Sequence, residues 1–267
     1  AKLRELRPEA DVALADLLHA APELATRYLL AQPLASLAGS SGATSGELSR
    51  LAELARRAPA AAVRARAVEL SAGIGPLMPT LIAAASDPAP RVREAAFRAI
   101  AVSPLATGIP AAALASKKDV WTFVRVAATD ALSAFPQDAA TTAALVTALA
   151  DPSARVRLSA LTGLGRHKVS LQGARVRQRL DDAREDGDIR ALAAKTLGEM
   201  CMQSAVDRLT TLALNARAPV DEADDRIGLA AIEALGTLHP PDLEARLAPL
   251  RVNEARMPVR RAVERAL

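Results

Sequence analysis

The sequence contains a single cysteine, three histidines and very few aromatic residues. Of its 267 residues, only 2% are Phe, Trp or Tyr. One cysteine, Cys201, cannot form an internal disulfide, and with so few histidines the sequence offers no typical zinc-binding pattern. Large aromatic side chains usually fill thick globular cores. Their scarcity favours thin helices that pack closely through alanine and leucine.

Long apolar runs are also missing. Proline and charged residues interrupt every candidate for the roughly 20 apolar residues that a membrane-spanning helix needs. We therefore expect a soluble chain, and we place it in the cytoplasm. The chain begins at Ala1 without a signal-type leader, so we interpret it as a processed or excised portion of a protein. Its net charge of +4 permits an acidic partner without requiring one.

A pattern of acidic residue, hydrophobic residue, arginine and alanines recurs along the sequence. It includes "DPAPRVREAAFRAI" from Asp87 and "DPSARVRLSALTGLG" from Asp151. The hydrophobic residue before the arginine, here called the mark residue, returns about every 30 residues, which is typical of stacked helical repeats. The mark residues are Val63, Val92, Val124, Val156, Ile189, Ile227 and Val259. Small or aliphatic residues follow each of them at helical spacing, so each copy contains one amphipathic helix.

Charged residues accompany the mark residues. An acidic residue lies five positions before most of them: Asp87, Asp119, Asp151, Glu222 and Glu254. An arginine follows six of them: Arg64, Arg93, Arg125, Arg157, Arg190 and Arg260. The acids fall where a helix begins, near the positive end of its dipole. We predict that each arginine reaches the turn of a neighbouring repeat, which gives a ladder of charge-assisted hydrogen bonds.

Two copies depart from this pattern, and we expect the ladder to be interrupted at both. Around Val63, the position of the acid is taken by Ala58. Around Ile227, the next residue is Gly228, and the arginine precedes the mark residue as Arg226.

These repeats resemble the HEAT-repeat family, and especially the short HEAT-like repeats of bacterial proteins. The two stretches quoted above carry the resemblance together with "MPVRRAVERAL" from Met257, and in weaker form it covers nearly the whole chain. It implies an all-α fold, an α-solenoid that forms a right-handed superhelix of about eight helix pairs. In each pair an A helix is followed by a B helix, which contains the mark residue and lines the concave side. The motif identifies a fold and not a function, because its residues hold the stack together.

The predicted helix pairs cover residues 9–38, 46–74, 76–102, 105–135, 138–166, 169–202, 203–238 and 240–267. We expect an N-terminal pair within 1–38, a Gly/Ser-rich hinge at 39–46 and a repeat array at 46–267. Terminal repeats of a solenoid need polar caps, which Arg261, Glu264 and Arg265 supply at the C-terminal end.

The sequence predicts no catalytic, cofactor-binding or metal-binding residue. His19, His167 and His239 are far apart, and we interpret them as satisfied or solvent-exposed side chains at helix ends. We interpret Cys201 as a packed side chain near a helix terminus.

Three further stretches, one rich in glycine and two acidic, are also interpreted as structural. The glycines of "GLGRHK" at 163–168 follow no strand, so they are expected to permit close helix approach and helix termination and not to bind phosphate. The acidic runs at 181–188 and 221–225 lack the spacing of a calcium loop, so we interpret them as solvated turns.

Positions two and five after the mark residue are expected to be less buried and to face the concave side. They include Phe97, Val126, Leu158, Leu161, Leu229 and Ile232, with Arg91, Arg98, Arg155, Lys195 and Arg226 beside them. Two interpretations stay open: these apolar residues form a stripe that binds a partner, or they are buried between repeats. Trp121, just before one B helix, is either an interface anchor or a plug between turns.

Taken together, these features favour a non-enzymatic scaffold, or the helical module of a larger protein. It would bind a protein or peptide segment along the concave face, with arginines selecting an acidic partner. The alternative is nucleic-acid binding, because some HEAT-like bacterial proteins resemble DNA glycosylases of the alkylpurine type. Such a protein needs basic residues without interleaved acids, whereas Glu69, Asp130 and Glu233 alternate with the basic positions here. Other short HEAT-like repeats resemble those of bilin lyases, but no cysteine or histidine arrangement supports pigment chemistry.

Overall fold

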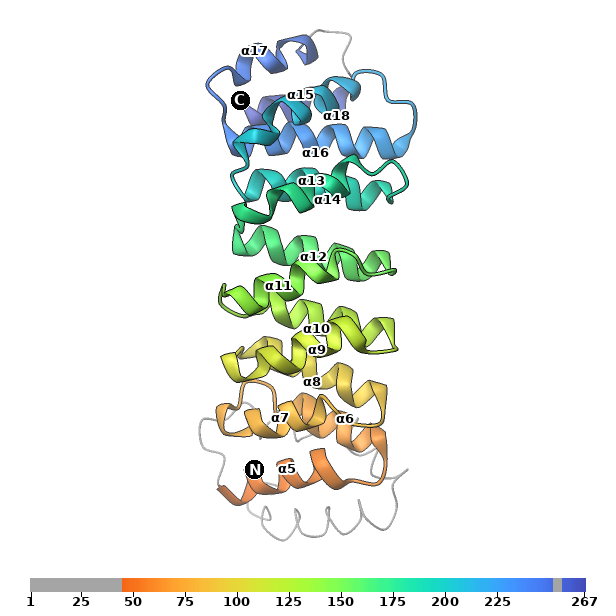
Figure 1. Ribbon diagram of the computed structural model, residues 1–267, viewed down its shortest axis with the longest axis vertical. Helices are drawn as coiled ribbons and strands as arrows, with labels where there is room; N and C mark the ends of the chain where they lie inside the picture. Colours follow the sequence, from red (N-terminus) through yellow and green to blue (C-terminus); the bar gives the residue numbers. More distant parts are fainter. Residues whose placement is uncertain (1–44, 252–255) are drawn as a thin grey trace, which may run out of the picture. The chain divides into compact units, whose positions relative to one another are not determined.

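The computed structural model describes residues 45–251 and 256–267, and every regular element in them is a helix. The chain divides into two compact units, the first ending at Phe135 and the second beginning at Pro136. Each unit is a stack of helix pairs, in which an A helix is followed by a B helix (Figure 1). This arrangement is an α-solenoid, and it confirms the fold class that the repeats predict.

In the first unit, the described part consists of three helix pairs. They are α5 (Ser45–Arg57) with α6 (Ala61–Leu70), α7 (Met78–Ala84) with α8 (Pro90–Val102), and α9 (Ile109–Lys118) with α10 (Thr122–Ala134); the short 3-10 helices η1 (Gly75–Leu77) and η2 (Ala106–Gly108) precede α7 and α9. The B helices α6, α8 and α10 contact one another in that order, and each A helix packs against its own B helix. The predicted pair at 9–38 lies outside the described residues, as do residues 39–44 of the predicted hinge, whereas Ser45 and Gly46 begin α5.

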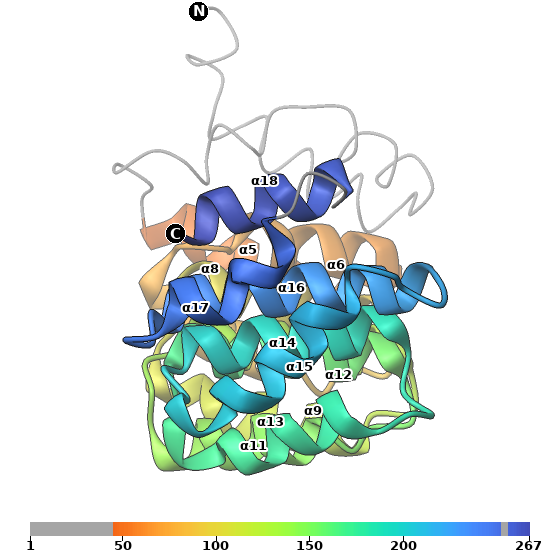
Figure 2. The ribbon, with the colours of Figure 1, turned by 90° about the horizontal axis from the view of Figure 1, so that it is seen from above.

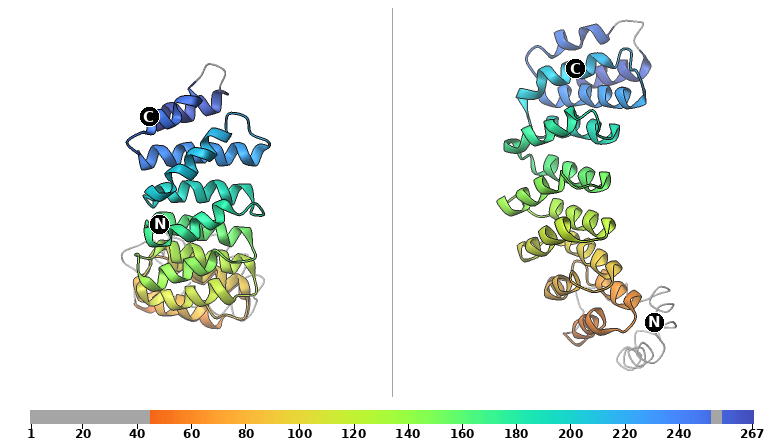
Figure 3. Two further views of the ribbon diagram at one scale, coloured as in Figure 1. Left: turned by 45° about the horizontal axis from the view of Figure 1, so that its top comes forward. Right: turned by 45° about the vertical axis from the view of Figure 1, so that its right-hand side comes forward.

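In the second unit, the described residues form four pairs (Figure 2). They are α11 (Ala139–Ala148) with α12 (Ala154–His167), α13 (Gly173–Asp181) with α14 (Gly187–Glu199), α15 (Val206–Asn215) with α16 (Glu222–Leu238), and α17 (Leu243–Leu247) with α18 (Met257–Ala266); the 3-10 helices are η3 (Ser170–Gln172), η4 (Gln203–Ala205) and η5 (Ala248–Leu250). The B helices α12, α14, α16 and α18 again contact one another in order, so they form one layer of the unit (Figure 3).

Aspartates organise several of the turns that precede B helices. The carboxylate of Asp87 accepts a hydrogen bond from the backbone N–H of Ala89 at 2.8 Å. Asp119 and Asp151 accept from the N–H two residues later at 2.9 and 2.8 Å. Each carboxylate thus pairs a backbone donor next to the helix start, where the helix dipole also favours negative charge.

The mark residues lie in the core of each unit. All seven are at most 1% exposed, as the repeat pattern predicts: Val63, Val92, Val124, Val156, Ile189, Ile227 and Val259. Burying aliphatic side chains of this size stabilises each layer by about 1.5–3 kcal/mol per residue relative to leaving them exposed. Among residues 45–251 and 256–267, no helix combines the length and apolar character that crossing a membrane requires.

Consecutive B helices of the second unit approach closely at glycines. A Cβ atom on Gly198 would lie 2.9 Å from the Cα of Ala234, and one on Gly236 would lie 2.8 Å from the Cα of Ala266. Both distances are shorter than two non-bonded carbon atoms tolerate. Only glycine therefore fits at these two helix crossings.

Candidate functional site

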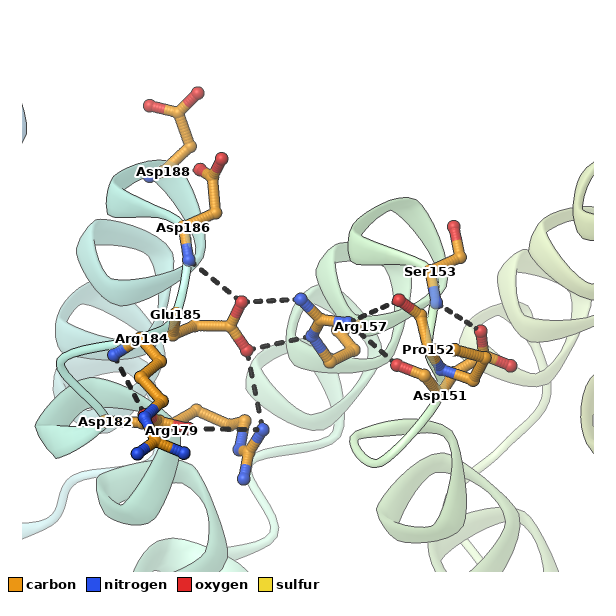
Figure 4. Close-up of polar contacts among 10 residues, drawn as sticks. All are labelled: Asp151, Pro152, Ser153, Arg157, Arg179, Asp182, Arg184, Glu185, Asp186 and Asp188. Carbon is orange, nitrogen blue, oxygen red and sulfur yellow. Dashed lines mark hydrogen bonds and ion pairs between the residues drawn. The ribbon is translucent and has the colours of Figure 1, made fainter.

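Arg157 shows how an arginine joins two repeats (Figure 4). Its Nε and Nη2 atoms donate to the two carboxylate oxygens of Glu185, in the turn before the next B helix, at 2.8 and 2.6 Å. Its Nη1 atom donates to the backbone carbonyls of Asp151 and Pro152 at 2.8 and 3.0 Å. The Glu185 side chain is 3% exposed and also accepts from Arg179 at 3.4 Å. Such a bidentate, largely desolvated pair fixes the spacing of the two repeats.

The first unit contains the same arrangement twice. Arg64 donates to both carboxylate oxygens of Asp87 at 2.7 and 2.9 Å, and Arg93 donates to those of Asp119 at 2.7 and 3.0 Å. Burial acts to raise the pKa of each aspartate. The hydrogen bonds from the arginine and from the backbone outweigh this effect, so both pKa values lie below the usual range of an aspartic acid.

The ladder is not interrupted at Val63, which corrects the expectation from the sequence. An arginine pairs with the carboxylate of the following repeat, so Arg64 uses Asp87 and needs no acid in its own turn. Its own turn contributes backbone carbonyls, and those of Ala58 and Pro59 accept from Arg64 at 2.9 and 3.2 Å. A side chain at position 58 is therefore not required for the ladder.

Around Ile227 the contacts between repeats change. Arg190 donates through Nε to the carbonyl of Leu180 at 3.0 Å, within its own repeat, and forms no ion pair with the described residues. The junction between α16 and α18 instead uses Arg256, which donates to the carboxylate of Asp225 and to the carbonyl of Ala216. The hydrogen bonds from Arg256 lower the pKa of Asp225.

Arg125 makes the contact within its own turn that Arg93 and Arg157 also make, because it donates to the carbonyl of Asp119 at 3.0 Å. The other members of the predicted ladder take different places. Glu222 lies on the surface with Arg226 at 3.6 Å, and Glu254 lies outside the described residues. Arg260, on the last B helix, lines a surface cavity. The sequence did not predict Glu185, because it precedes its mark residue by four positions and not five.

Half of the predicted apolar stripe belongs to the core. Phe97, Leu161 and Ile232 are 0% exposed, so the expectation that the fifth position is less buried and faces the concave side is wrong. With about 100° of rotation per residue, the fifth position after the mark residue lies only about 40° around the helix from the first position after it. Both positions are on the side where neighbouring B helices meet. Val126, Leu158 and Leu229, at the second position, are partly exposed.

We call outward face the side of the B helices on which Arg91 and Arg98 of α8 lie. In the first unit, an aromatic cluster formed by Arg91, Trp121 and Phe123 lies on this face. The ring centroids of Trp121 and Phe123 are 5.6 Å apart, and the guanidinium carbon of Arg91 lies 4.5 Å from the centroid of the Phe123 ring. Trp121 is 49% exposed and the adjacent Val120 is 82% exposed. The quadrupole of an aromatic ring attracts a cation placed over its face. The guanidinium of Arg91 and the Phe123 ring therefore hold each other in position at the solvent-exposed surface.

Glu94 holds the arginines of this face in place. Its carboxylate accepts from Arg91 at 2.8 Å and pairs with Arg98 at 2.6 Å, while the Glu94 side chain is only 7% exposed. Glu94 occupies the second position after Val92, which the sequence predicted to be less buried and to face the concave side. Its nearly buried carboxylate instead pairs with two exposed guanidinium groups, and the guanidinium of Arg91 rests on the Phe123 ring.

The outward face of the second unit is formed by Arg155, Leu158, Lys195, Arg226 and Leu229. Leu158 and Leu229 are partly buried, whereas Arg155, Lys195 and Arg226 are exposed. Arg226 pairs with Asp188 of the preceding B helix at 2.8 Å. This face therefore has shallow apolar contacts between charged side chains, and no aromatic residue among those named.

No three His, Cys, Asp or Glu side chains in residues 45–251 and 256–267 gather as metal ligands. His167 ends α12 in a buried position without a hydrogen-bond partner for either ring nitrogen, which contradicts the expectation of a satisfied or exposed imidazole. His239 is exposed, and Cys201 is exposed and not packed. His19 lies outside the described residues.

Comparisons with known proteins agree with the repeat architecture. The family model of the HEAT repeat matches residues 77–102, which contain α7 and α8. No curated protein matches the chain in sequence. The crystal structure of the Escherichia coli protein YibA is similar over 88% of this chain and 85% of its own, with 20% identity and a TM-score of 0.56, which shows the fold alone.

Two further solved structures resemble the chain more weakly. Human deoxyhypusine hydroxylase, solved with glycerol, is 18% identical over 90% of this chain and 99% of its own, with a TM-score of 0.42. A designed armadillo repeat protein is 17% identical over 88% and 97%, with a TM-score of 0.36.

Proposed function

Because the chain is a HEAT-like repeat protein, we propose that it is a non-enzymatic scaffold that binds a protein or peptide segment across the outward faces of its B helices. The outward side chains of consecutive B helices are brought side by side, so an extended or helical segment meets several repeats at once. Binding energy then comes from a few anchors and not from one deep pocket. We place this scaffold in the cytoplasm.

The aromatic cluster of the first unit carries this proposal. Trp and Arg are the residue types most often found at the energetic centres of protein interfaces. Here Trp121 is half exposed, Phe123 is stacked under Arg91, and Glu94 fixes the position of Arg91. A rigid, exposed aromatic group loses little conformational entropy when a partner covers it, which favours its use as an anchor.

The partner segment should combine an apolar side chain with an acidic one. The apolar group would cover Trp121 and Val120, and the acidic group would meet Arg91 or Arg98 at the edge of the cluster. Both arginines already share Glu94, so the face is only mildly positive. This balance selects against a nucleic-acid backbone, which needs several unpaired cations in succession.

The test is a selection of binding peptides from a displayed random library with the full 267-residue chain. We expect enriched sequences that pair an aromatic or aliphatic residue with Asp or Glu. The double variant Trp121→Ala/Phe123→Ala should bind these peptides at least about tenfold more weakly in fluorescence polarisation, because it removes the anchor. The matched control is Leu171→Ala on η3, a residue that is 91% exposed and far from the aromatic cluster in sequence.

Two results would contradict the proposal. If the double variant binds the selected peptides as tightly as the unchanged chain, the aromatic cluster is not the binding face. If no peptide is enriched and duplex DNA is retained on filters at low salt, the alternative of nucleic-acid binding replaces the scaffold.

A further inference from the structure

The A helix α9 has an exposed side that the proposed function does not use. Its exposed residues recur at helical spacing, so they lie on one face of the helix: Pro110, Leu114, Lys117 and Lys118. The opposite side of α9 is buried, and α9 packs against α10 (Figure 1). Leu114 is 58% exposed, although apolar side chains of this size are usually buried. We call these four residues the lysine face.

The lysines of this face have no carboxylate partner in residues 45–251 and 256–267. Between residues 103 and 123 the only acidic residue is Asp119. Its side chain is 7% exposed and belongs to the ladder. The arginines of the outward face already share the carboxylate of Glu94. Lys117 and Lys118 are therefore the cations beside the α9–α10 turn that no described carboxylate neutralises.

The lysine face continues into the aromatic cluster through the turn between α9 and α10. Helix α9 ends at Lys118 and α10 begins at Thr122. In the turn, Val120 and Trp121 are 82% and 49% exposed. With a rise of about 1.5 Å per helical residue and at most about 3.6 Å per extended residue, the Cα atoms of Leu114 and Trp121 are at most about 17 Å apart. About five residues of an extended segment span this distance.

We propose that the partner segment crosses this turn and also contacts the lysine face, so that it carries acidic residues between two apolar residues. One apolar residue covers Trp121 and Val120, and the other covers Leu114. The acidic residues between them pair with Lys117 and Lys118. This inference rests on the proposed function, because it uses the same aromatic anchor, and it adds the residues that select the sequence of the partner.

The two lysines select an acidic residue more strongly than the arginines of the outward face. A carboxylate gains most from a cation that no other carboxylate neutralises, and complementary charges across an interface give specificity. Pairs of this kind lie at the surface, so each gain is modest and decreases as the ionic strength rises. The negative end of the α9 dipole also favours cations in the last turn of the helix. A purely structural role of the lysines would therefore affect stability and leave binding unchanged.

The experiment is a selection from a displayed library of random peptides of about 12 residues. It uses the full 267-residue chain and its variant Lys117→Gln/Lys118→Gln. On the unchanged chain we expect peptides with two apolar residues about five positions apart and with Asp or Glu between them. On the variant, the enrichment of Asp and Glu between the apolar residues should be lost, whereas the apolar residue that covers Trp121 should remain.

Fluorescence polarisation with one enriched peptide measures the same contacts singly. Lys117→Gln/Lys118→Gln should weaken binding at least about fivefold at low salt, and Leu114→Ala about threefold. A peptide whose acidic residues are replaced by their amides should bind the unchanged chain at least about fivefold more weakly. With the lysine variant, the same change in the peptide should cost less than about twofold, because both changes remove one interaction.

A matched control makes the same charge change at the end of another A helix. Arg56→Gln/Arg57→Gln removes two neighbouring exposed cations from the last turn of α5 and should leave peptide binding unchanged. Circular dichroism verifies that every variant is folded.

The possible results separate this inference from the proposed function. If the enriched peptides need Trp121 but bind the lysine variant as tightly as the unchanged chain, the inference is overturned and the proposed function stands. If no peptide is enriched, or if Trp121→Ala/Phe123→Ala also leaves peptide binding unchanged, both are overturned. Duplex DNA that is bound through Lys117 and Lys118 in place of peptides would overturn both as well.

Discussion

In the first unit, consecutive B helices are joined by Arg64 with Asp87 and by Arg93 with Asp119, whereas in the second unit only Arg157, with Glu185, keeps this arrangement. Farther along the second unit, Arg190 bonds only to the carbonyl of Leu180 in its own repeat. At the junction of α16 and α18 the arginine comes from the later repeat and the carboxylate from the earlier one, as Arg256 and Asp225. The same repeat pattern therefore tolerates a loss of the ladder. Something else must hold those later repeats together.

Close helix crossings take over this role in the second unit. The ninth position after the mark residue lies where consecutive B helices cross. In the second unit it is Gly165, Gly198 and Gly236, and in the first it is Ala72, Ala101 and Ser133. Gly198 and Gly236 bring the backbones of neighbouring B helices into direct contact, whereas Gly165 makes room for the side chains of Glu199 and Thr196; all three add dispersion contacts between the helices. The comparison indicates that the distance between consecutive B helices is fixed in two ways. Paired charges act at the start of the helix, and glycine contacts act near its end.

Among variants that distinguish glycine contacts from paired charges, the largest loss of stability is expected for Gly198→Val. A side chain at this position meets the backbone of Ala234, so the helices must separate or the crossing must distort. We expect the free energy of unfolding of the second unit to fall by about 3 kcal/mol, measured by urea denaturation with circular dichroism. Hydrogen exchange followed by mass spectrometry assigns the loss to α14 and α16.

The matched control is Ala101→Val, which enlarges the equivalent residue of the first unit. Ala101 is only partly buried, so we expect a loss below about 1 kcal/mol. Equal losses in the two variants would mean that the glycine crossings are not special to the second unit.

A smaller effect is expected when the ladder is cut. Arg157→Ala leaves the Glu185 carboxylate, which is 3% exposed, with the backbone N–H of Asp186 at 2.9 Å and the longer contact from Arg179 at 3.4 Å. We expect a loss of about 2 kcal/mol in the free energy of unfolding. Arg190→Ala removes a single hydrogen bond to a carbonyl and should cost about 1 kcal/mol. Identical melting curves for Arg157→Ala and the unchanged chain would show that the ion pair contributes nothing.

The contrast between these arginines shows what the sequence could predict. Its period, its amphipathic spacing and its buried mark residues depend on local geometry, so they could be read from residue order alone. The partner of an arginine depends on the next turn in space. Arg64 pairs although Ala58 replaces the acid in its own turn, and Glu185 takes part although it stands one position out of register.

The surface was harder to predict than the stack. Leu161 and Leu158 are both apolar and three residues apart, yet one is in the core and the other on the outward face. Their burial depends on how a neighbouring B helix crosses, which the spacing within one helix does not specify. The division at Phe135 was not predicted either, because the repeat period continues through it.

In the folded chain, the carboxylates of the first unit's ladder should become protonated at a lower pH than ordinary aspartic acids. The pKa values of Asp87 and Asp119 are lowered in the folded chain. The unfolded chain therefore takes up protons first, near pH 4, and the stability from these pairs is lost as the pH falls further through the folded pKa values. We expect the free energy of unfolding to fall by about 1 kcal/mol per pH unit in this range.

Asp119→Asn provides the comparison, because it removes one of the two titrating groups. The variant should be less stable than the unchanged chain at pH 7, and its stability should depend less steeply on pH below 4. Slopes that coincide in urea denaturation series would show that Asp119 does not titrate with folding. The ladder of the first unit would then owe its strength to hydrogen-bond geometry more than to charge.

The smallest effect on stability is expected for the outward face of the second unit. Leu158 and Leu229 are partly exposed, so Leu158→Glu together with Leu229→Glu should leave the helical signal and the melting temperature nearly unchanged. If this face contacts the partner segment as the first unit does, the double variant should bind selected peptides at least about tenfold more weakly. Leu161→Glu is the contrast, because it buries a charge at a position that is 0% exposed and should unfold the unit. A large loss of stability in the double variant would place both leucines in the core, whereas unchanged binding would restrict recognition to the aromatic cluster.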